Sequence, residues 1–234
     1  HWARGNFTEE QQRRIERTLQ MKPRRTASGV ATITVLTKPW KCSSECLYCP
    51  NDLRMPKSYL SDEPACQRAE RTFFDPYLQV AARLKALTEM GHITDKVELI
   101  ILGGTWSDYP LAYQIWFVRE LFRALNDGSK AQNNIAKRRT QYEHAGISSD
   151  VATLKKQVAP LQERIANQEL SYNQAFDLHY AISEAWGTVA TWQSATWEEL
   201  ETEHHTNETA HHRVVGLVIE TRPERITPHH AYTL

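Results

Sequence analysis

The sequence lacks any run of about 18 consecutive apolar residues, the length that a membrane-spanning helix requires. It also lacks a charged-then-apolar leader, internal repeats and low-complexity tracts, so we expect no signal peptide. Cysteine is scarce: there are four in 234 residues, which argues against a secreted disulfide scaffold and indicates a reducing cytoplasm. The apolar fraction of 41% and seven tryptophans are enough for the core of one domain, with or without a large insertion.

The sequence has no net charge, yet its charges are unevenly distributed. Residues 1–41 carry nine Lys or Arg against three Asp or Glu. Residues 42–127 carry nine basic against twelve acidic side chains, and residues 128–213 carry eight against eleven. A basic N-terminal arm beside an acidic body suits a polyanion that docks on one face, although charge alone favours a solvated helix.

Short β-branched runs alternate with amphipathic stretches, which predicts βαβ units and a parallel sheet. We expect strands at 30–36, 97–102 and 214–219, and helices at 8–20, 76–91 and 113–125. A long polar loop is expected between the first strand and residue 64. Apolar residues recur at helical spacing from 150 and again across 171–186, which we interpret as a helical hairpin inserted into the last crossover.

Cys42, Cys46 and Cys49 form the most informative motif, with the spacing C-x3-C-x2-C. Three thiolates hold three irons of a [4Fe–4S] cluster and leave the fourth open, whereas ferredoxins close all four positions. The pattern resembles that of radical S-adenosylmethionine (SAM) enzymes, in which the open iron binds SAM and the reduced cluster cleaves it to a 5′-deoxyadenosyl radical. The alternative is a structural zinc site with Cys66 or a histidine as fourth ligand, but no second Cys or His knuckle accompanies the triplet.

Each unusual motif follows a predicted strand, where the ligand sites of parallel α/β proteins gather. After the second strand, Gly103 and Gly104 allow close approach to the backbone, although such a pair in isolation indicates only a turn. After the third, Glu220 and Arg222 are two residues apart and are expected on the same side of a strand. Glu220 suits a ribose hydroxyl or an ammonium group, and Arg222 suits a carboxylate. Alternatively, the two side chains form a surface ion pair with each other. Tyr48 suits packing on a purine ring or in the core.

Tandem histidines occur at 204–205 and 211–212, with glutamates nearby. Neighbouring residues point to different sides of a helix or strand, so at most one of each pair faces a common ion. We therefore expect a polar surface there rather than a metal site.

Together these motifs resemble one family, the catalytic subunit of Elongator and its bacterial and archaeal homologues. The stretches that carry the resemblance are 22–31, 38–39, 46–50, 58–59, 63–64, 75–77, 91–92, 95–98, 103–105 and 215–223. They span about residues 20–127 and 205–228. Asn51 and Asp52 depart from the pattern, because many relatives have two glycines after Pro50.

The resemblance implies an α/β fold, a partial radical SAM (β/α) barrel of which this chain holds the first three strands. It also implies that the enzyme installs a carboxymethyl-type group at C5 of the wobble uridine of tRNA, using SAM and acetyl-CoA. Carried over by motif, the [4Fe–4S] ligands would be Cys42, Cys46 and Cys49, with no catalytic residue beyond the cluster. SAM would be held by Tyr48, Gly103, Gly104, Thr105, Glu220 and Arg222, and tRNA would contact Lys22, Arg24 and Arg25.

The expected organisation is a basic arm at 1–28, a half-barrel at 29–127 and 214–234, and a helical insertion at 128–213 that suggests a bacterial branch. The chain starts at His1 and stops after the third strand, so we expect the second half of the barrel and the acetyltransferase domain to be missing. This chain alone would then not complete the reaction. Expected partners are tRNA, acetyl-CoA through the missing domain, and a second copy or other Elongator-like subunits, but no membrane.

Two alternatives stay open. The first is a radical SAM enzyme that acts on a small molecule or peptide. Salt-sensitive tRNA binding through the basic arm would distinguish the tRNA enzyme from it. The second is a zinc-stabilised module that binds tRNA or protein without catalysis. One zinc and no iron in the purified protein would favour it.

Overall fold

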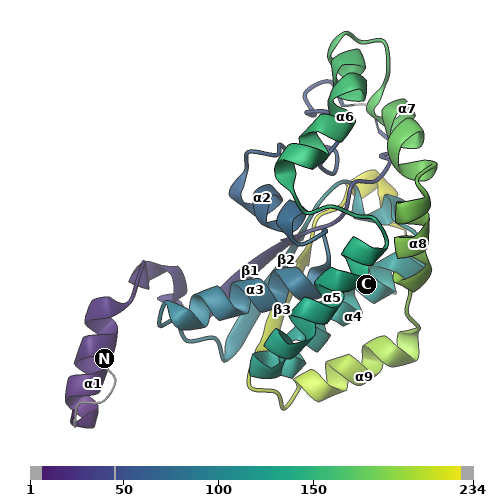
Figure 1. Ribbon diagram of the computed structural model, residues 1–234. Helices are drawn as coiled ribbons and strands as arrows, with labels where there is room; N and C mark the ends of the chain where they lie inside the picture. The colour runs from purple at the N-terminus through teal and green to yellow at the C-terminus, as the bar shows by residue number, and fades with distance from the viewer. Residues whose placement is uncertain (1–6, 45, 228–234) are drawn as a thin grey trace.

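The computed structural model describes residues 7–44 and 46–227. At its centre lies a parallel sheet in the order β1-β2-β3, made by β1 (Ala31–Leu36), β2 (Lys96–Leu102) and β3 (Arg213–Ile219) (Figure 1). Leu36 lies opposite Leu102 in the register, so β1 and β2 end at the same level. The predicted strands, their parallel pairing and the α/β class are confirmed.

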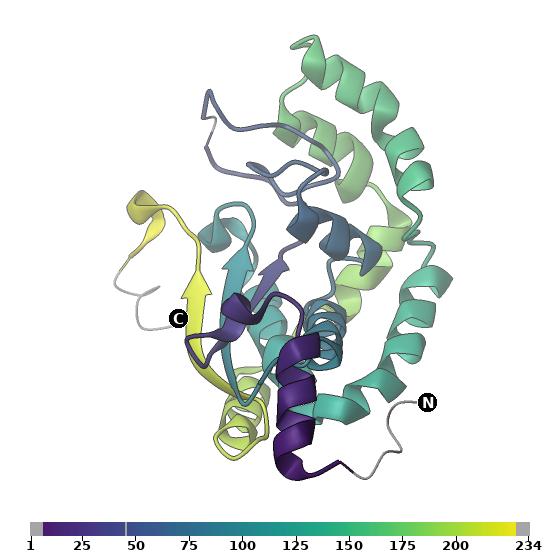
Figure 2. The ribbon, with the colours of Figure 1, turned by 90° about the vertical axis from the view of Figure 1, so that its left-hand side faces the viewer.

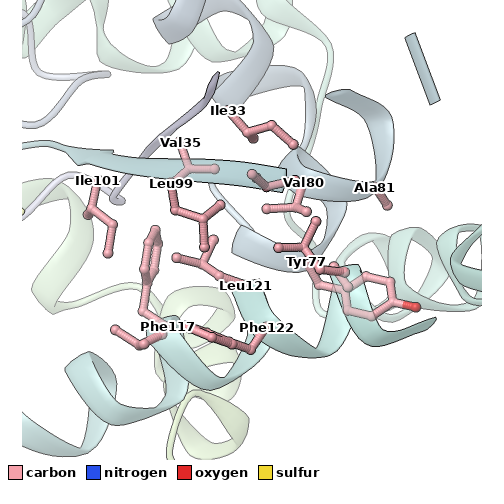
Figure 3. Close-up of a cluster of buried hydrophobic side chains, with 14 of the residues drawn as sticks. Ile33, Val35, Tyr77, Val80, Ala81, Leu99, Ile101, Phe117, Leu121 and Phe122 are labelled. Carbon is pink, nitrogen blue, oxygen red and sulfur yellow. The ribbon is translucent and has the colours of Figure 1, made fainter. Parts of the chain in front are cut away.

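Two helices cover one face of the sheet: α3 (Pro76–Glu89) and α4 (Leu111–Asp127). Their apolar sides meet the β-branched and leucine side chains of the strands in the main core, where Val35, Leu99, Val80 and Phe117 are fully buried (Figure 3). Burial of such side chains stabilises the fold by about 1.5–3 kcal/mol each. This layer fixes the strands and therefore the positions of the loops that follow them.

The ends of α3 match the capping signals in the sequence. A side-chain oxygen of Asp75 accepts a hydrogen bond from the Leu78 amide at 2.9 Å, and Pro76 occupies the first helical position. Gly91 follows the helix with a φ of 80°, the left-handed conformation that glycine adopts without strain.

The opposite face of the sheet is more polar and partly exposed. Thr32 donates to the Glu98 carboxylate across this face at 3.3 Å. On β3, Val215 and Val218 are 55% and 43% exposed. Within the described part of the chain, β3 is an edge strand that pairs only with β2.

The segment between α4 and β3 is helical, as predicted, but it is more than a hairpin. It contains α5 (Ala131–His144), α6 (Val151–Ala166), α7 (Tyr172–Phe176), α8 (Glu184–Trp192) and α9 (Trp197–Asn207), with a π-helical turn at Asp177–Ala181. The stretch expected at 171–186 is interrupted because Ser183 caps a new helix. The hairpin prediction missed α5, which has few apolar residues, and α9, whose Thr196–Glu199 capping box was a readable signal.

The N-terminal part begins with α1 (Glu9–Leu19), which projects from the body (Figures 1 and 2). As predicted, Thr8 caps it, accepting a hydrogen bond from the Gln11 amide at 3.3 Å. An unpredicted helix, α2 (Pro64–Arg71), begins where the expected long loop ends. Residues 1–6 of the predicted arm and 228–234 of the predicted half-barrel lie outside the described residues. No described helix is long and apolar enough to cross a membrane.

Candidate functional site

The loops that follow the three strands meet around one cavity of about 250 Å³. The cysteine loop follows β1, the glycine pair follows β2, and the Glu-Thr-Arg segment follows β3. The residues lining the cavity are Cys42, Cys46, Tyr48, Cys49, Lys57, Ser58, Gly103, Gly104, Thr105, Glu220, Thr221 and Arg222. The structure thus brings together every residue that the sequence assigned to the cluster and to SAM.

The three thiols share the cavity but have different partners. Cys42 is buried, and its Sγ lies 3.5 Å from the Thr105 hydroxyl. Arg222 donates to Cys46 Sγ at 2.9 Å, and Cys49 Sγ lies 3.2 Å from the Ser58 hydroxyl. In residues 7–44 and 46–227, no three His, Cys, Asp or Glu side chains are gathered closely enough to hold a metal ion.

The kind of donor at the cavity suits a cluster held by three thiolates, although the three sulfurs are not gathered around one point. Three sulfurs from one loop line the cavity, and no histidine among the described residues lines it. Cys66, the fourth cysteine, is fully buried beside Met55 and Phe74 in a separate apolar cluster. Burial, together with Glu63 and Asp52, raises the pKa of its thiol to about 12, so it is a poor thiolate donor. A set of three sulfurs leaves one position of a four-iron cluster open.

Two helices of the segment between α4 and β3 contact the cysteine loop. Asn173 on α7 accepts a hydrogen bond from the Cys42 amide at 3.1 Å and donates one to the Cys42 carbonyl at 2.8 Å. On α6, the Gln162 side chain accepts from the Leu53 amide at 2.8 Å and donates to the Asn51 carbonyl at 3.0 Å. These residues carry no motif, and only the three-dimensional structure identifies them.

Asp108 and Lys57 hold the other side of the same loop. Asp108 accepts from the amide and hydroxyl of Ser43 at 2.8 and 2.9 Å. Burial alone would raise the pKa of Asp108, but hydrogen bonds from Ser43 and Arg225 outweigh it and lower the pKa. The buried Lys57 ammonium donates to the Ser44 carbonyl at 2.6 Å. The loop is therefore anchored by amide side chains on one side and by charged side chains on the other.

The two glycines after β2 have different roles. A Cβ on Gly103 would lie 1.9 Å from the Thr37 hydroxyl oxygen, whereas a Cβ on Gly104 would find its nearest neighbour, the Tyr109 hydroxyl, at 3.8 Å. Thr37 is buried, and its amide donates to the Leu102 carbonyl at 2.9 Å. Gly103 thus allows two strand ends to approach closely, and Gly104 leaves free space beside the cavity.

Glu220 and Arg222 lie in the loop, because β3 ends at Ile219. The expectation that they share one side of a strand is therefore wrong, although both line the cavity. Tyr59 donates to the Glu220 carboxylate at 2.6 Å, and burial together with this contact raises the pKa of the Tyr59 phenol. Arg222 forms an ion pair with Glu224 in addition to its contact with Cys46.

The tip of the cysteine loop is exposed. The Tyr48 side chain is 90% exposed and Leu47 is fully exposed. Tyr48 is therefore not a core aromatic, and its ring is accessible to a ligand in the cavity. Trp40 packs instead against Tyr109 and Phe176, with ring centroids 6.0 and 5.6 Å apart.

The basic residues predicted to contact tRNA lie away from this cavity. Lys22, Arg24 and Arg25 are exposed; the two arginines lie on a 3-10 helix before β1, η2 (Pro23–Thr26), and Lys22 immediately precedes it. The cysteines follow β1, and six residues of strand span about 20 Å. The structure thus places the two predicted sites at opposite ends of the sheet.

Two further arginines extend the basic region. Burial and the charge of Arg25 lower the pKa of Arg68, and burial, Arg25 and Arg68 lower the pKa of Arg83. Among the described carboxylates, none forms an ion pair with these three arginines. Neighbouring guanidinium groups without acidic partners favour an external anion.

The tandem histidines are not simply a polar surface. The His204 ring packs on Phe122 with centroids 4.2 Å apart, and buried His212 donates from Nδ1 to the Thr94 carbonyl at 2.8 Å. His205 stays exposed beside Glu208. The expectation of a polar surface is therefore wrong for His204 and His212. The two residues of each pair point to different sides, and one of them packs against the protein.

Fold and site together define an α/β protein whose three-cysteine loop meets two other strand-end loops. No family model matches the chain. The chain is 44% identical over 126 residues to the tRNA uridine(34) acetyltransferase of Methanocaldococcus infernus, covering 51% of this chain and 24% of that protein. It is 46% identical over 102 residues to the same-named protein of Dehalococcoides mccartyi, covering 44% and 22%. It is 40% identical over 128 residues to human Elongator complex protein 3, covering 50% and 23%.

The solved archaeal Methanocaldococcus infernus Elp3 with an N-terminal deletion is 23% identical, with a TM-score of 0.44, over 88% of this chain and 26% of that one. This likeness is too low to assign the fold. The sequence matches show that the chain is homologous, over about half its length, to the tRNA uridine(34) acetyltransferases and Elongator complex protein 3. The chain spans about a quarter of the length of these curated relatives.

We predict that Asn173→Ala will loosen the cysteine loop. The variant loses two hydrogen bonds to Cys42, each contributing about 1 kcal/mol, so amide exchange should rise roughly tenfold or more. Hydrogen–deuterium exchange of peptides that contain Cys42 measures this. Asn167→Ala is the control, because Asn167 is exposed and its side chain bonds Glu169. Equal exchange in both variants would contradict the prediction.

We predict that Gly103→Ala will lower the free energy of unfolding by about 1–3 kcal/mol, because the new methyl group overlaps Thr37. Gly104→Ala, with open space around its Cβ, should change it by less than about 0.5 kcal/mol. Urea denaturation of both variants provides the measurement, and similar losses would show that the close approach is unimportant.

Proposed function

We propose that this chain is the radical SAM portion of an enzyme that installs a carboxymethyl-type group at C5 of the wobble uridine of tRNA, using SAM and acetyl-CoA. The observation that carries the proposal is the convergence of all three strand-end motifs on one cavity. The homology to proteins named tRNA uridine(34) acetyltransferase supports the reaction class. We assign acetyl-CoA to no residue of this chain.

Cys42, Cys46 and Cys49 would hold the [4Fe–4S] cluster. When bound, such a cluster supplies the electron that cleaves SAM at its open iron. Asn173 and Asp108 fix the backbone on the two sides of Cys42 and thereby limit how far the thiols spread. The arrangement supports one thiolate set in one loop, backed by helices from a distant part of the sequence.

SAM would lie beside the cluster on Gly104 and the loop after β3. Glu220 suits a ribose hydroxyl or an ammonium group, which would replace its bond from Tyr59, and Arg222 suits a carboxylate. The exposed Tyr48 ring suits stacking on adenine. Thr105 is buried, and its hydroxyl lies 3.5 Å from the Cys42 sulfur. Thr105 and Gly103 shape this wall of the site.

tRNA would bind through the basic arm. Lys22, Arg24 and Arg25 are exposed, and Arg68 and Arg83 extend the same charge over α2 and α3. Their separation from the cysteine cavity suits a long polyanion that contacts the protein at more than one place. A radical SAM enzyme with a small-molecule substrate would have no use for this second contact.

We predict that anaerobic reconstitution of this chain with iron and sulfide will give a brown protein with roughly four irons per chain. Cys46→Ala should abolish iron binding, because two thiolates do not retain a cubane cluster. Metal analysis and the visible absorption spectrum provide the measurement.

The matched control is Cys66→Ala, which removes the cysteine that does not line the cavity and should leave the iron content unchanged. One zinc per chain without visible absorbance would instead favour the zinc-stabilised binding module. Loss of iron in both variants would contradict the assignment of the three ligands.

We predict that replacing Arg24 and Arg25 together by Ala will weaken tRNA binding about tenfold at low salt and flatten its salt dependence. Each phosphate contact that is lost lowers the slope of log K against log salt by about one. Filter binding of tRNA at several salt concentrations measures both effects.

Lys155 and Lys156 on α6 form a charge-matched control, because both are exposed but lie in the insertion. Their replacement by Ala should leave affinity and slope almost unchanged. Binding that is indifferent to salt and to both arginines would favour the small-molecule alternative.

A further inference from the structure

A second cavity, of about 410 Å³, lies behind the cysteine loop between the end of β1 and the inserted helices. It shares no lining residue with the cysteine cavity. Its walls are aromatic: Trp40 from the loop, Phe176 from α7, Tyr180 from the π-helical turn and Trp186 from α8. Cavities of this size and apolar character bind small molecules.

The aromatic rings are held in place by each other. Phe176 lies 5.6 Å from Trp40 and 5.1 Å from Tyr180, and Tyr180 lies 5.7 Å from Trp186, measured between ring centroids. The Tyr180 hydroxyl donates to the Leu53 carbonyl at 3.0 Å, which fixes that ring further. A planar ligand would therefore enter between preformed walls, with little side-chain ordering to oppose binding.

Lys38 lies on the wall nearest β1 and is only 8% exposed. Its ammonium donates to the Gln193 side chain at 2.5 Å and lies 5.3 and 4.6 Å from the ring centroids of Trp40 and Tyr113. No carboxylate in the described part of the chain forms an ion pair with it. Burial lowers the pKa of Lys38 to about 8.

The other charged groups at this cavity are already paired. Lys41 and Asp177 form an ion pair at 2.5 Å with both side chains about half-exposed, which places them at the rim. Small residues, Ala181, Gly187 and Ala190, complete the lining and are exposed, so they leave an opening to solvent. The buried lysine is thus the remaining cation among the residues that line this cavity, which opens to solvent.

We propose that this cavity binds a small planar aromatic anion, whose ring lies among Trp40, Phe176 and Trp186 and whose acidic group pairs with the Lys38 ammonium. The anion would supply the charge partner that Lys38 lacks, and the apolar aromatic walls strengthen this pair relative to one in water. The site does not use the cysteines, and it stands whether or not the chain carries a cluster.

The pH dependence follows from the charge of Lys38. The anion binds the protonated amine, so affinity should be constant well below pH 8 and fall about tenfold per pH unit above it. The groups that face the ammonium are Gln193 before α9, Tyr113 from α4 and Trp40 from the loop, with the Lys41–Asp177 pair at the rim. Burial raises the pKa of Tyr113 well above its usual value, so that phenol stays neutral throughout this range.

Isothermal titration of the chain tests the proposal with 2-naphthoate and its neutral counterpart 2-naphthalenemethanol. We expect the acid to bind about tenfold more tightly at pH 7. Lys38→Met, which keeps an apolar side chain of similar length, should remove that preference and the fall above pH 8 while leaving the alcohol affinity unchanged. Uridine 5′-monophosphate forms a further arm, and its binding would identify the ring-bearing anion as a nucleotide.

Gly187 offers a matched pair of variants, because a Cβ there has no neighbour within 4 Å. Gly187→Phe should fill the cavity and abolish binding of both naphthalene probes, whereas Gly187→Ala should retain it. Circular dichroism and thermal midpoints confirm folding of every variant. Equal affinity for acid and alcohol, or an acid preference that survives Lys38→Met, would overturn the proposal.

Discussion

The parallel hydrogen bonding of β1, β2 and β3 is the constraint on which the rest of the structure depends. It ends the strands along one edge of the sheet, so three loops that are far apart in the sequence surround the same cavity. The close approach of Gly103 to Thr37 brings the ends of β1 and β2 together without an intervening side chain. The parallel direction of the strands, more than any single side chain, therefore determines where the cavity lies.

The second requirement is that the cysteine loop be held in place without regular secondary structure of its own. Polar side chains satisfy its backbone from two sides, Asn173 and Gln162 from the insertion and Asp108 from the turn after β2. Tyr172 adds a hydrogen bond from α7 to the Met55 carbonyl at 2.7 Å. Buried backbone groups need such partners, so α6 and α7 contribute directly to holding the loop.

Much of this architecture could be predicted from the sequence because its signals are local. β-branched runs gave the three strands, and Asp75 with Pro76 and Gly91 gave both ends of α3. The three motifs were expected at one cavity because each follows a strand, whereas Lys57, Ser58 and Thr221, which also line it, were not predicted. By contrast, α5 has little amphipathic pattern, and Asn173 and Lys38 act through contacts with residues more than a hundred positions away. The predicted third strand ends at residue 219, as β3 does, so the error was to extend the alternation of a strand to Glu220 and Arg222 beyond its end.

The hydrogen bonds between insertion and loop also limit how the protein can be re-engineered. Tyr180 and Gln162 both bond the backbone of Leu53, and Gln162 also bonds that of Asn51. Replacing residues 128–213 by a short linker would remove the hydrogen-bond partners of these main-chain groups. It would also expose the aromatic rings that the helices cover. The helices are thus not a detachable appendage, and transplanting them between homologous scaffolds would require exchange of the cysteine loop as well.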